Sequence, residues 1–131
     1  MIDKRQKAIQ EFGAFVSELV QDLNHLSEAG WALLVEGKRD EKALRDLGYA
    51  GTMATVSSHS RLGSRAFRGS SKVVILTDLD REGGTLAARF VKRLSHEGFQ
   101  TSLAERRRLK AASKGVFLHI ENLSRFADSG D

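Results

Sequence analysis

Two groups of carboxylates each follow an apolar run in the sequence. The acids are Asp78, Asp80 and Glu82 after residues 73–77, and Glu36 after residues 31–35. Alternate carboxylates that leave a buried strand repel one another unless a cation neutralises their charge. Carboxylate oxygens are hard ligands that suit Mg²⁺ and also Mn²⁺. Two strands that both end in acids therefore predict a divalent metal site, with these four side chains as candidate ligands.

Basic residues flank these acids along the chain. Residues 58–72 contain no acidic side chain, and residues 104–114 form a second basic segment. Charged runs are most often a solvated face, but beside a metal site they favour contacts with phosphate. The predicted nucleic-acid contacts are Lys38, Arg61, Arg65, Arg68, Arg81, Arg106, Arg107 and Arg108. Of the histidines, His59 is expected near phosphate, and the others, His25, His96 and His119, at the surface or the edge of the core.

Strands alternate with helices from residue 31 onward. The predicted strands are 31–36, 52–57, 73–77, 99–103 and 116–120, and the predicted helices are 39–47, 82–96 and 104–113. Residues 58–72 are predicted to be a polar loop. This alternation indicates an α/β fold with a doubly wound, mostly parallel sheet of four to five strands, Rossmann-like in its layers. Ligands of such sheets bind outside the carboxyl ends of the strands, where the strand order reverses. If the first and third strands are neighbours, Glu36 and Asp78 face the same crevice.

A long helix is predicted over residues 3–29, ahead of the first strand. Its apolar residues recur at spacings of three and four, and Gly30 follows at the expected end. The stripe consists of Ile9, Phe12, Val16, Leu19, Leu23 and Leu26. It either packs on the chain's own domain, which we expect, or forms a dimer seam. The predicted organisation is a helix at 1–30, one domain at 31–122 and a tail at 123–131 that frays from Ala127.

Composition places the chain among ordinary globular proteins. Its 131 residues suffice for one domain, and 40% are hydrophobic and 29% charged. It has no cysteine, which excludes disulfides and thiolate metal ligands. No apolar run approaches the roughly 20 residues of a membrane-spanning helix, so we expect no membrane association and a cytoplasmic location. A net charge of +4 favours polyanionic partners.

The segment 35–44 and the acidic motif at 78–83 together resemble the Toprim domain. The pattern of that family has a glutamate after the first strand and Asp-x-Asp after the third. Here the glutamate matches Glu36, and the Asp-x-Asp matches Asp78 and Asp80. The resemblance covers about residues 31–122, and the size is most similar to that of small stand-alone Toprim proteins. It implies that the three acids bind Mg²⁺, that Glu36 also acts as a general acid or base, and that Glu82 is a further ligand.

The resemblance implies two alternatives for function. Toprim domains occur in topoisomerases, bacterial-type primases, nucleases and recombination mediators. The first hypothesis is a Mg²⁺-dependent nuclease, or a related phosphoryl-transfer enzyme, that acts on RNA or DNA with Glu36, Asp78 and Asp80 as catalytic residues and two metal ions. The alternative is a non-catalytic, metal-binding module that binds nucleic acid or assembles with proteins, as a homodimer or in a larger nucleic-acid-processing complex.

Other interpretations of the acidic motif fit less well. An EF-hand loop needs glutamate at its twelfth position, where this chain has Arg89, and a helix rather than a strand before it. A type IA topoisomerase has a further glutamate where this chain has Gly84. Strand passage also needs a tyrosine nucleophile on another domain, and a primase needs a template-gripping region and a zinc module. A nuclease and a binding module therefore remain as the two hypotheses.

Overall fold

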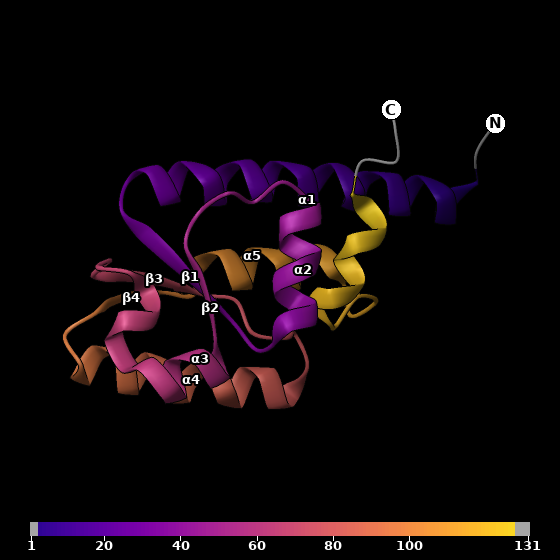
Figure 1. Cartoon of the computed structure of the whole chain (residues 1–131). Helices are drawn as coiled ribbons and strands as arrows, with labels where there is room; N and C mark the ends of the chain where they lie inside the picture. Colours follow the sequence, from indigo (N-terminus) through magenta and orange to yellow (C-terminus); the bar gives the residue numbers. More distant parts are fainter. Residues whose placement is uncertain (1–2, 128–131) are drawn as a thin grey trace.

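A four-stranded parallel sheet forms the centre of the molecule. The computed structural model describes residues 3–127. Its strands are β1 (Trp31–Val35), β2 (Met53–Thr55), β3 (Lys72–Ile75) and β4 (Gln100–Ser102). Their order is β2-β1-β3-β4, and all three pairings are parallel. The predicted doubly wound α/β fold is confirmed, with four strands in the sheet (Figure 1).

Helices cover both faces of this sheet (Figure 1). They are α1 (Lys4–Glu28), α2 (Lys38–Asp46), α3 (Val56–Leu62), α4 (Arg81–His96) and α5 (Ala104–Ser113), with the 3₁₀ helices η1 (Gly63–Phe67) and η2 (Ile120–Phe126). Alternate strand residues enter opposite cores, because side chains alternate across a strand. Leu33 and Val35 pack with α1, α5 and η2, whereas Ala32 and Leu34 pack with η1 and α4. The strands are therefore apolar on both faces, as parallel strands between helical layers must be.

Helix α1 packs along one face of the domain. Asp3 caps its N-terminus, accepting a hydrogen bond from the Gln6 backbone N–H at 2.8 Å. The buried stripe of the helix comprises Phe12, Val16, Leu19, Val20 and Leu23. These side chains join the same core as α5 and η2. The stripe therefore buries its apolar surface within the chain.

The strand order brings the two predicted acidic strand ends side by side. β1 pairs directly with β3, with Leu34 opposite Ile75. The ladder continues one step further, because the Leu76 N–H donates to the Leu34 carbonyl at 2.9 Å. Each strand therefore ends at the same edge of the sheet, and β2 and β4 lie on either side. Because the strand order reverses here, this edge is where ligands of such folds bind.

The predicted fifth strand at 116–120 is wrong. Residues 116–119 are irregular, and the backbone turns through positive φ at Lys114 and Gly115 just before them. The Leu118 carbonyl accepts from the Leu79 N–H at 2.6 Å, and the Ile120 N–H donates to the Asp78 side chain at 2.8 Å. The segment therefore bonds to the loop after β3 instead of extending the sheet. From Ile120 the chain forms η2, whose Ile120 and Leu123 are buried; of the tail predicted to fray, residues 128–131 lie outside the described residues.

The predicted loop at 58–72 is also largely helical. Thr55 caps α3, accepting from the Ser58 N–H at 3.1 Å, and η1 follows directly. His59, expected near phosphate, is instead a core residue with 4% exposure, packed against Phe67 and Phe90. Its Nε2 lies 3.0 Å from a carboxylate oxygen of Glu97. The N-terminal capping motif at residues 55–58 is the local signal for this helix.

Within residues 3–127, none of the helices is both long enough and apolar enough to cross a membrane.

Candidate metal centre

The carboxylate of Glu36 accepts a hydrogen bond from the backbone that follows the neighbouring strand, β3. Its Oε2 accepts a hydrogen bond from the Asp78 N–H at 2.8 Å. The last hydrogen bond between β1 and β3 joins the Leu76 N–H to the Leu34 carbonyl, two residues before each of these acids. The sheet register therefore positions Glu36 against Asp78, and the resemblance-based pairing of these two acids has a direct geometric cause.

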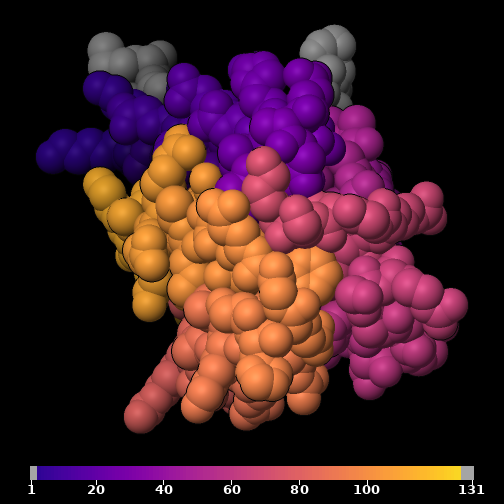
Figure 2. Space-filling model, turned by 90° about the vertical axis from the view of Figure 1, so that its left-hand side faces the viewer, coloured from indigo at the N-terminus to yellow at the C-terminus, as the bar shows by residue number. Residues whose placement is uncertain are grey.

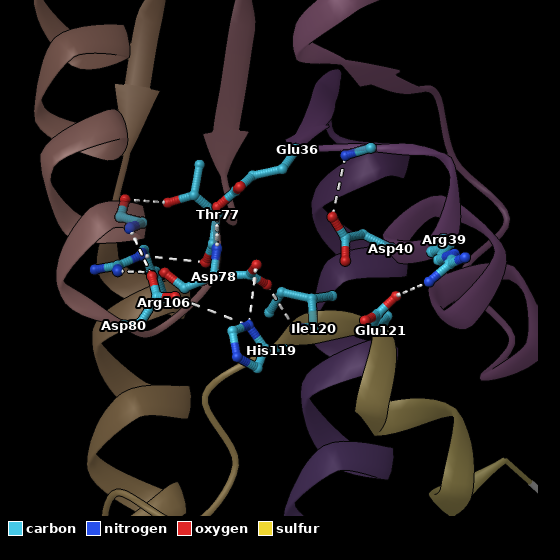
Figure 3. A network of polar contacts seen from close by, with 12 residues as sticks. Glu36, Arg39, Asp40, Thr77, Asp78, Asp80, Arg106, His119, Ile120 and Glu121 are labelled. Carbon is cyan, nitrogen blue, oxygen red and sulfur yellow. Dashed lines mark hydrogen bonds and ion pairs between the residues drawn. The ribbon is translucent and has the colours of Figure 1, made fainter.

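Asp80 caps helix α4 and holds its first turn close to β3. Its Oδ1 accepts from the Gly83 N–H at 2.7 Å, and the Thr77 hydroxyl donates to the Gly83 carbonyl at 2.7 Å. A β-carbon at residue 83 would lie 2.6 Å from the Asp78 carbonyl carbon, closer than side chains tolerate. Glycine at this position therefore lets the helix start approach the Asp78 backbone. We call Glu36, Asp78 and Asp80 the acidic cluster. The Oδ2 of Asp80 is not used by the cap and faces this cluster and His119 (Figure 3).

Arg106 of α5 fixes the backbone that carries the acids. Its Nε donates to the Thr77 carbonyl at 3.3 Å, and its Nη2 donates to the Asp78 carbonyl at 2.6 Å. The residue is buried, at 7% exposure, and this burial lowers the pKa of the guanidinium while the nearby acids act in the opposite direction. The fork shape of the guanidinium suits this pair of carbonyls. Arg106 is therefore bonded to the protein backbone, next to the acids that it positions (Figure 3).

The segment 118–120 closes the cluster from the side opposite Glu36. The Ile120 N–H donates to Asp78 Oδ1 at 2.8 Å. His119 Nδ1 lies 3.3 Å from Asp78 Oδ2 and 3.8 Å from Asp80 Oδ2. The hydrogen bond to Asp78 raises the pKa of the His119 imidazole above its usual value. Both oxygens of Asp78 thus have partners in the C-terminal segment (Figure 3).

The electrostatics of the cluster favour a bound cation. Burial raises the pKa of Glu36, and the charges of Asp78, Asp40 and Asp80 raise it further against the backbone hydrogen bond. Burial likewise raises the pKa of Asp40, followed by the charge of Asp78. Asp78 is the less exposed of the two aspartates, with 18% of its side chain accessible against 32% for Asp80. Carboxylates that raise one another's pKa are relieved by a divalent ion, so this donor set fits Mg²⁺ or Mn²⁺.

Glu82 faces a shallow cleft next to this cluster. The cleft has a volume of about 420 Å³ and is lined by Glu36, Arg81, Glu82, Thr85, Leu86 and Arg89. Arg81 and Arg89 of α4 thus share this cleft with two carboxylates, Glu82 of the same helix and Glu36 after β1.

The basic residues predicted to contact nucleic acid do not gather in one place. Arg68 follows η1, and the Ser70 hydroxyl donates to the Gly30 carbonyl, which places this segment at the amino ends of the strands. Arg108 lies 3.1 Å from Asp22 of α1. In Figure 2 the α3–η1 segment (magenta to pink) projects on one side and the C-terminal segment (yellow) lies on the other. The remaining predicted contacts, Lys38, Arg61, Arg65, Arg81 and Arg107, are exposed.

Sequence reasoning missed three side chains of this region. His119 is exposed, as expected, with 46% of its side chain accessible, but its position beside two of the acids was not predicted. Arg89 lines the cleft, and Asp40 is a buried carboxylate that accepts from the Gly37 N–H at 3.0 Å. One signal for His119 was available, because it follows an apolar run just as Asp78 does. The roles of Arg89 and Asp40 depend on helix packing that residue spacing does not encode.

Comparison with known proteins agrees with this arrangement. The sequence model of the Toprim domain matches residues 31–112. A UPF0292 protein of Pyrococcus abyssi is 37% identical over 103 residues, which are 77% of this chain and 77% of that protein. A UPF0292 protein of Methanosarcina barkeri is 34% identical over 110 residues, 82% of this chain and 77% of that protein. A solved structure from Aquifex aeolicus superposes with a TM-score of 0.65 at 28% identity, covering 81% of this chain and 95% of that one.

Proposed function

This chain belongs to the Toprim domain family, and we propose that it cleaves phosphodiester bonds of RNA or DNA with the help of divalent metal ions. The observation that carries the proposal is the carboxyl edge of β1 and β3, where Glu36 accepts a hydrogen bond from the Asp78 N–H and where Asp78 and Asp80 each offer a carboxylate oxygen close enough to share an ion. Membership of the family supports a metal-dependent role in nucleic-acid chemistry. The nuclease activity is our inference from the acids together with the cleft beside them.

The three acids would hold the metal, with Glu82 as an outer carboxylate on the cleft side. When bound, a divalent ion lowers the pKa of water and stabilises charge on phosphoryl oxygens. Glu36 is suited to take a proton from the attacking water, because its carboxylate lines the cleft beside Asp78. The water oxygen then bonds to phosphorus, the phosphorus–ester oxygen bond breaks, and the leaving oxygen takes up a proton.

Cationic side chains would hold the substrate phosphates. Arg81 and Arg89 line the cleft with Glu36, and Lys38 is exposed on the first turn of α2. Guanidinium groups bind phosphate through two parallel hydrogen bonds and stabilise its charge in the transition state. These residues lie nearer the acids than Arg68 or Arg108 do, so we assign them to the reacting phosphate and the others to more distant parts of a nucleic acid.

A cleavage assay tests the proposal. Purified protein is incubated with end-labelled single- and double-stranded RNA and DNA in Mg²⁺ or Mn²⁺, alongside Asp78→Asn and Asp80→Asn. The asparagine at position 80 keeps an acceptor for the Gly83 N–H, so the cap on α4 is preserved. We expect cleavage by the wild type that EDTA abolishes and that falls by at least about a hundredfold in both variants. Cleavage that survives both substitutions would refute the assignment.

A second candidate function is binding without cleavage. It is favoured by the distribution of basic side chains, several of which lie away from the acids at the amino ends of the strands or beside α1. Such a surface binds nucleic acid through counterion release, so affinity falls steeply with salt. Salt-dependent binding of RNA or DNA with no cleavage in either metal would identify this function in place of the nuclease.

A further inference from the structure

His119 adds a nitrogen donor to the acidic cluster. Its Nδ1 lies 3.3 Å from Asp78 Oδ2 and 3.8 Å from Asp80 Oδ2, and one donor atom of each residue lies within 4.8 Å of the others. Adjacent ligand atoms on a small octahedral ion are separated by about 3 Å. The three donor atoms are therefore close enough together to share one ion, and the three side chains lie next to one another in Figure 3.

The backbone on both sides of His119 is fixed to the acidic loop. The Leu118 carbonyl accepts from the Leu79 N–H at 2.6 Å, and the Ile120 N–H donates to Asp78 Oδ1 at 2.8 Å. Ile120 is itself 1% exposed and anchors η2 in the core. The imidazole is thus held over Asp78 and Asp80 by its chain neighbours. His119 is exposed, with 46% of its side chain accessible, but its backbone is fixed on both sides.

A nitrogen ligand changes the metal that a site prefers. Carboxylates and water suit Mg²⁺, whereas imidazole binds transition metals better, in the order given by the Irving–Williams series. Mn²⁺ accepts both kinds of ligand and has a size close to that of Mg²⁺. A site with two aspartates and one histidine should therefore favour Mn²⁺ over Mg²⁺ more strongly than a site with carboxylates alone.

We propose that His119 is a metal ligand that gives this centre a preference for a transition-metal ion such as Mn²⁺ over Mg²⁺. The inference rests on the metal centre of the proposed function and extends it. The ligand comes from a segment that lies beyond residues 31–112, which match the Toprim domain. The centre is thus completed by the loop between α5 and η2, a part of the chain outside the matched domain.

Metal titrations of the whole chain test this ligand without any enzyme assay. Mn²⁺ affinity is measured from the loss of the free-ion electron paramagnetic resonance signal, and Mg²⁺ affinity by calorimetry. The proteins are the wild type, His119→Ala, His119→Gln and the control His96→Ala, whose histidine is exposed on α4. We expect both changes at 119 to weaken Mn²⁺ binding by about tenfold or more and Mg²⁺ binding by less than about threefold. The control should bind both ions as the wild type does.

Electron spin echo envelope modulation of protein-bound Mn²⁺ gives a second readout, because a nitrogen nucleus bonded to the ion modulates the echo. Modulation from a directly bonded ¹⁴N is expected in the wild type and in His96→Ala, and its absence is expected in both variants at 119. Wild-type modulation without ¹⁴N, or equal Mn²⁺ affinities in wild type and His119→Ala, would overturn the inference while leaving the acidic metal centre in place. Stronger Mn²⁺ binding in His119→Ala would also overturn it, since the imidazole would then only compete for Asp78. A wild type that binds neither ion would refute the metal centre itself.

Discussion

Gly83 and Gly84 are adjacent in sequence but face different surroundings, which makes them a matched pair of test positions. A β-carbon at 83 would lie 2.6 Å from the Asp78 carbonyl carbon and closer still to its oxygen. A β-carbon at 84 would have its nearest neighbour, the Nη2 of Arg106, at an ordinary 3.7 Å. We therefore predict opposite outcomes for Gly83→Ala and Gly84→Ala.

The magnitudes follow from packing and helix propensity. Alanine in place of a helical glycine contributes about 0.5–1 kcal/mol of stability. At 83 this gain is outweighed, because overpacking against backbone costs about 1–3 kcal/mol. The clash should be near the upper end of that range, since Arg106 holds the Asp78 carbonyl at 2.6 Å and resists its movement. The net loss is about 2 kcal/mol, and the displaced Asp78 should weaken metal binding by about tenfold.

Thermal melts in EDTA and Mn²⁺ titrations measure both effects. Gly83→Ala should lower the Tm by about 5–10 °C and weaken metal binding, and Gly84→Ala should raise the Tm by a few degrees and leave metal binding unchanged. Equal behaviour of the two variants would show that the start of α4 does not press on the Asp78 backbone. The proposed role of Gly83 in positioning Asp78 for metal binding would then be refuted.

Two further predictions concern the support and the protonation of the cluster. Arg106→Lys keeps the positive charge but loses the guanidinium that donates to both the Thr77 and Asp78 carbonyls, so metal affinity should fall by about tenfold. The control is Arg107→Lys, on the exposed side of α5. Equal metal affinities of the two variants would show that Arg106 does not position the acids. In EDTA at pH 7, Glu36→Gln should have a higher Tm than the wild type. The raised pKa of Glu36 means that its ionised carboxylate is less favourable in the native state than in the unfolded state, and glutamine removes this cost. That difference should shrink as the pH falls towards the ordinary value of a glutamate, where the wild-type carboxyl takes up its proton in the folded state; a difference that does not change with pH contradicts this explanation.

The strands and most helices of this fold are predictable from the sequence because each carries a local signal. β1 and β3 are short apolar runs that end in acids, and α4 begins with a capping aspartate. The neighbouring positions of Glu36 and Asp78 depend on the strand order, which cannot be read from the sequence alone. Once β1 pairs with β3, the acidic pair follows from the register.

The parts that sequence reasoning missed depend on contacts between distant segments. Residues 116–120 have the apolar character of a strand, but their hydrogen-bonding groups pair with Leu79 and the Asp78 side chain. His119 enters the site only because of this docking. Arg106 belongs to a basic run that resembles a phosphate-binding surface, and only the packing of α5 turns its guanidinium towards two backbone carbonyls.

The most direct test of the metal centre is a calorimetric titration of Mg²⁺ and Mn²⁺ into the wild type and Asp78→Asn. Asparagine keeps the shape of Asp78 and an acceptor for the Ile120 N–H, but removes the charge of the less exposed of Asp78 and Asp80. We predict saturable binding of both ions by the wild type and none by the variant. The Tm of the variant in EDTA should equal or slightly exceed that of the wild type, because repulsion among the carboxylates is reduced. Unchanged metal affinity in Asp78→Asn would contradict the account, and a large loss of stability without metal would assign Asp78 a structural role instead.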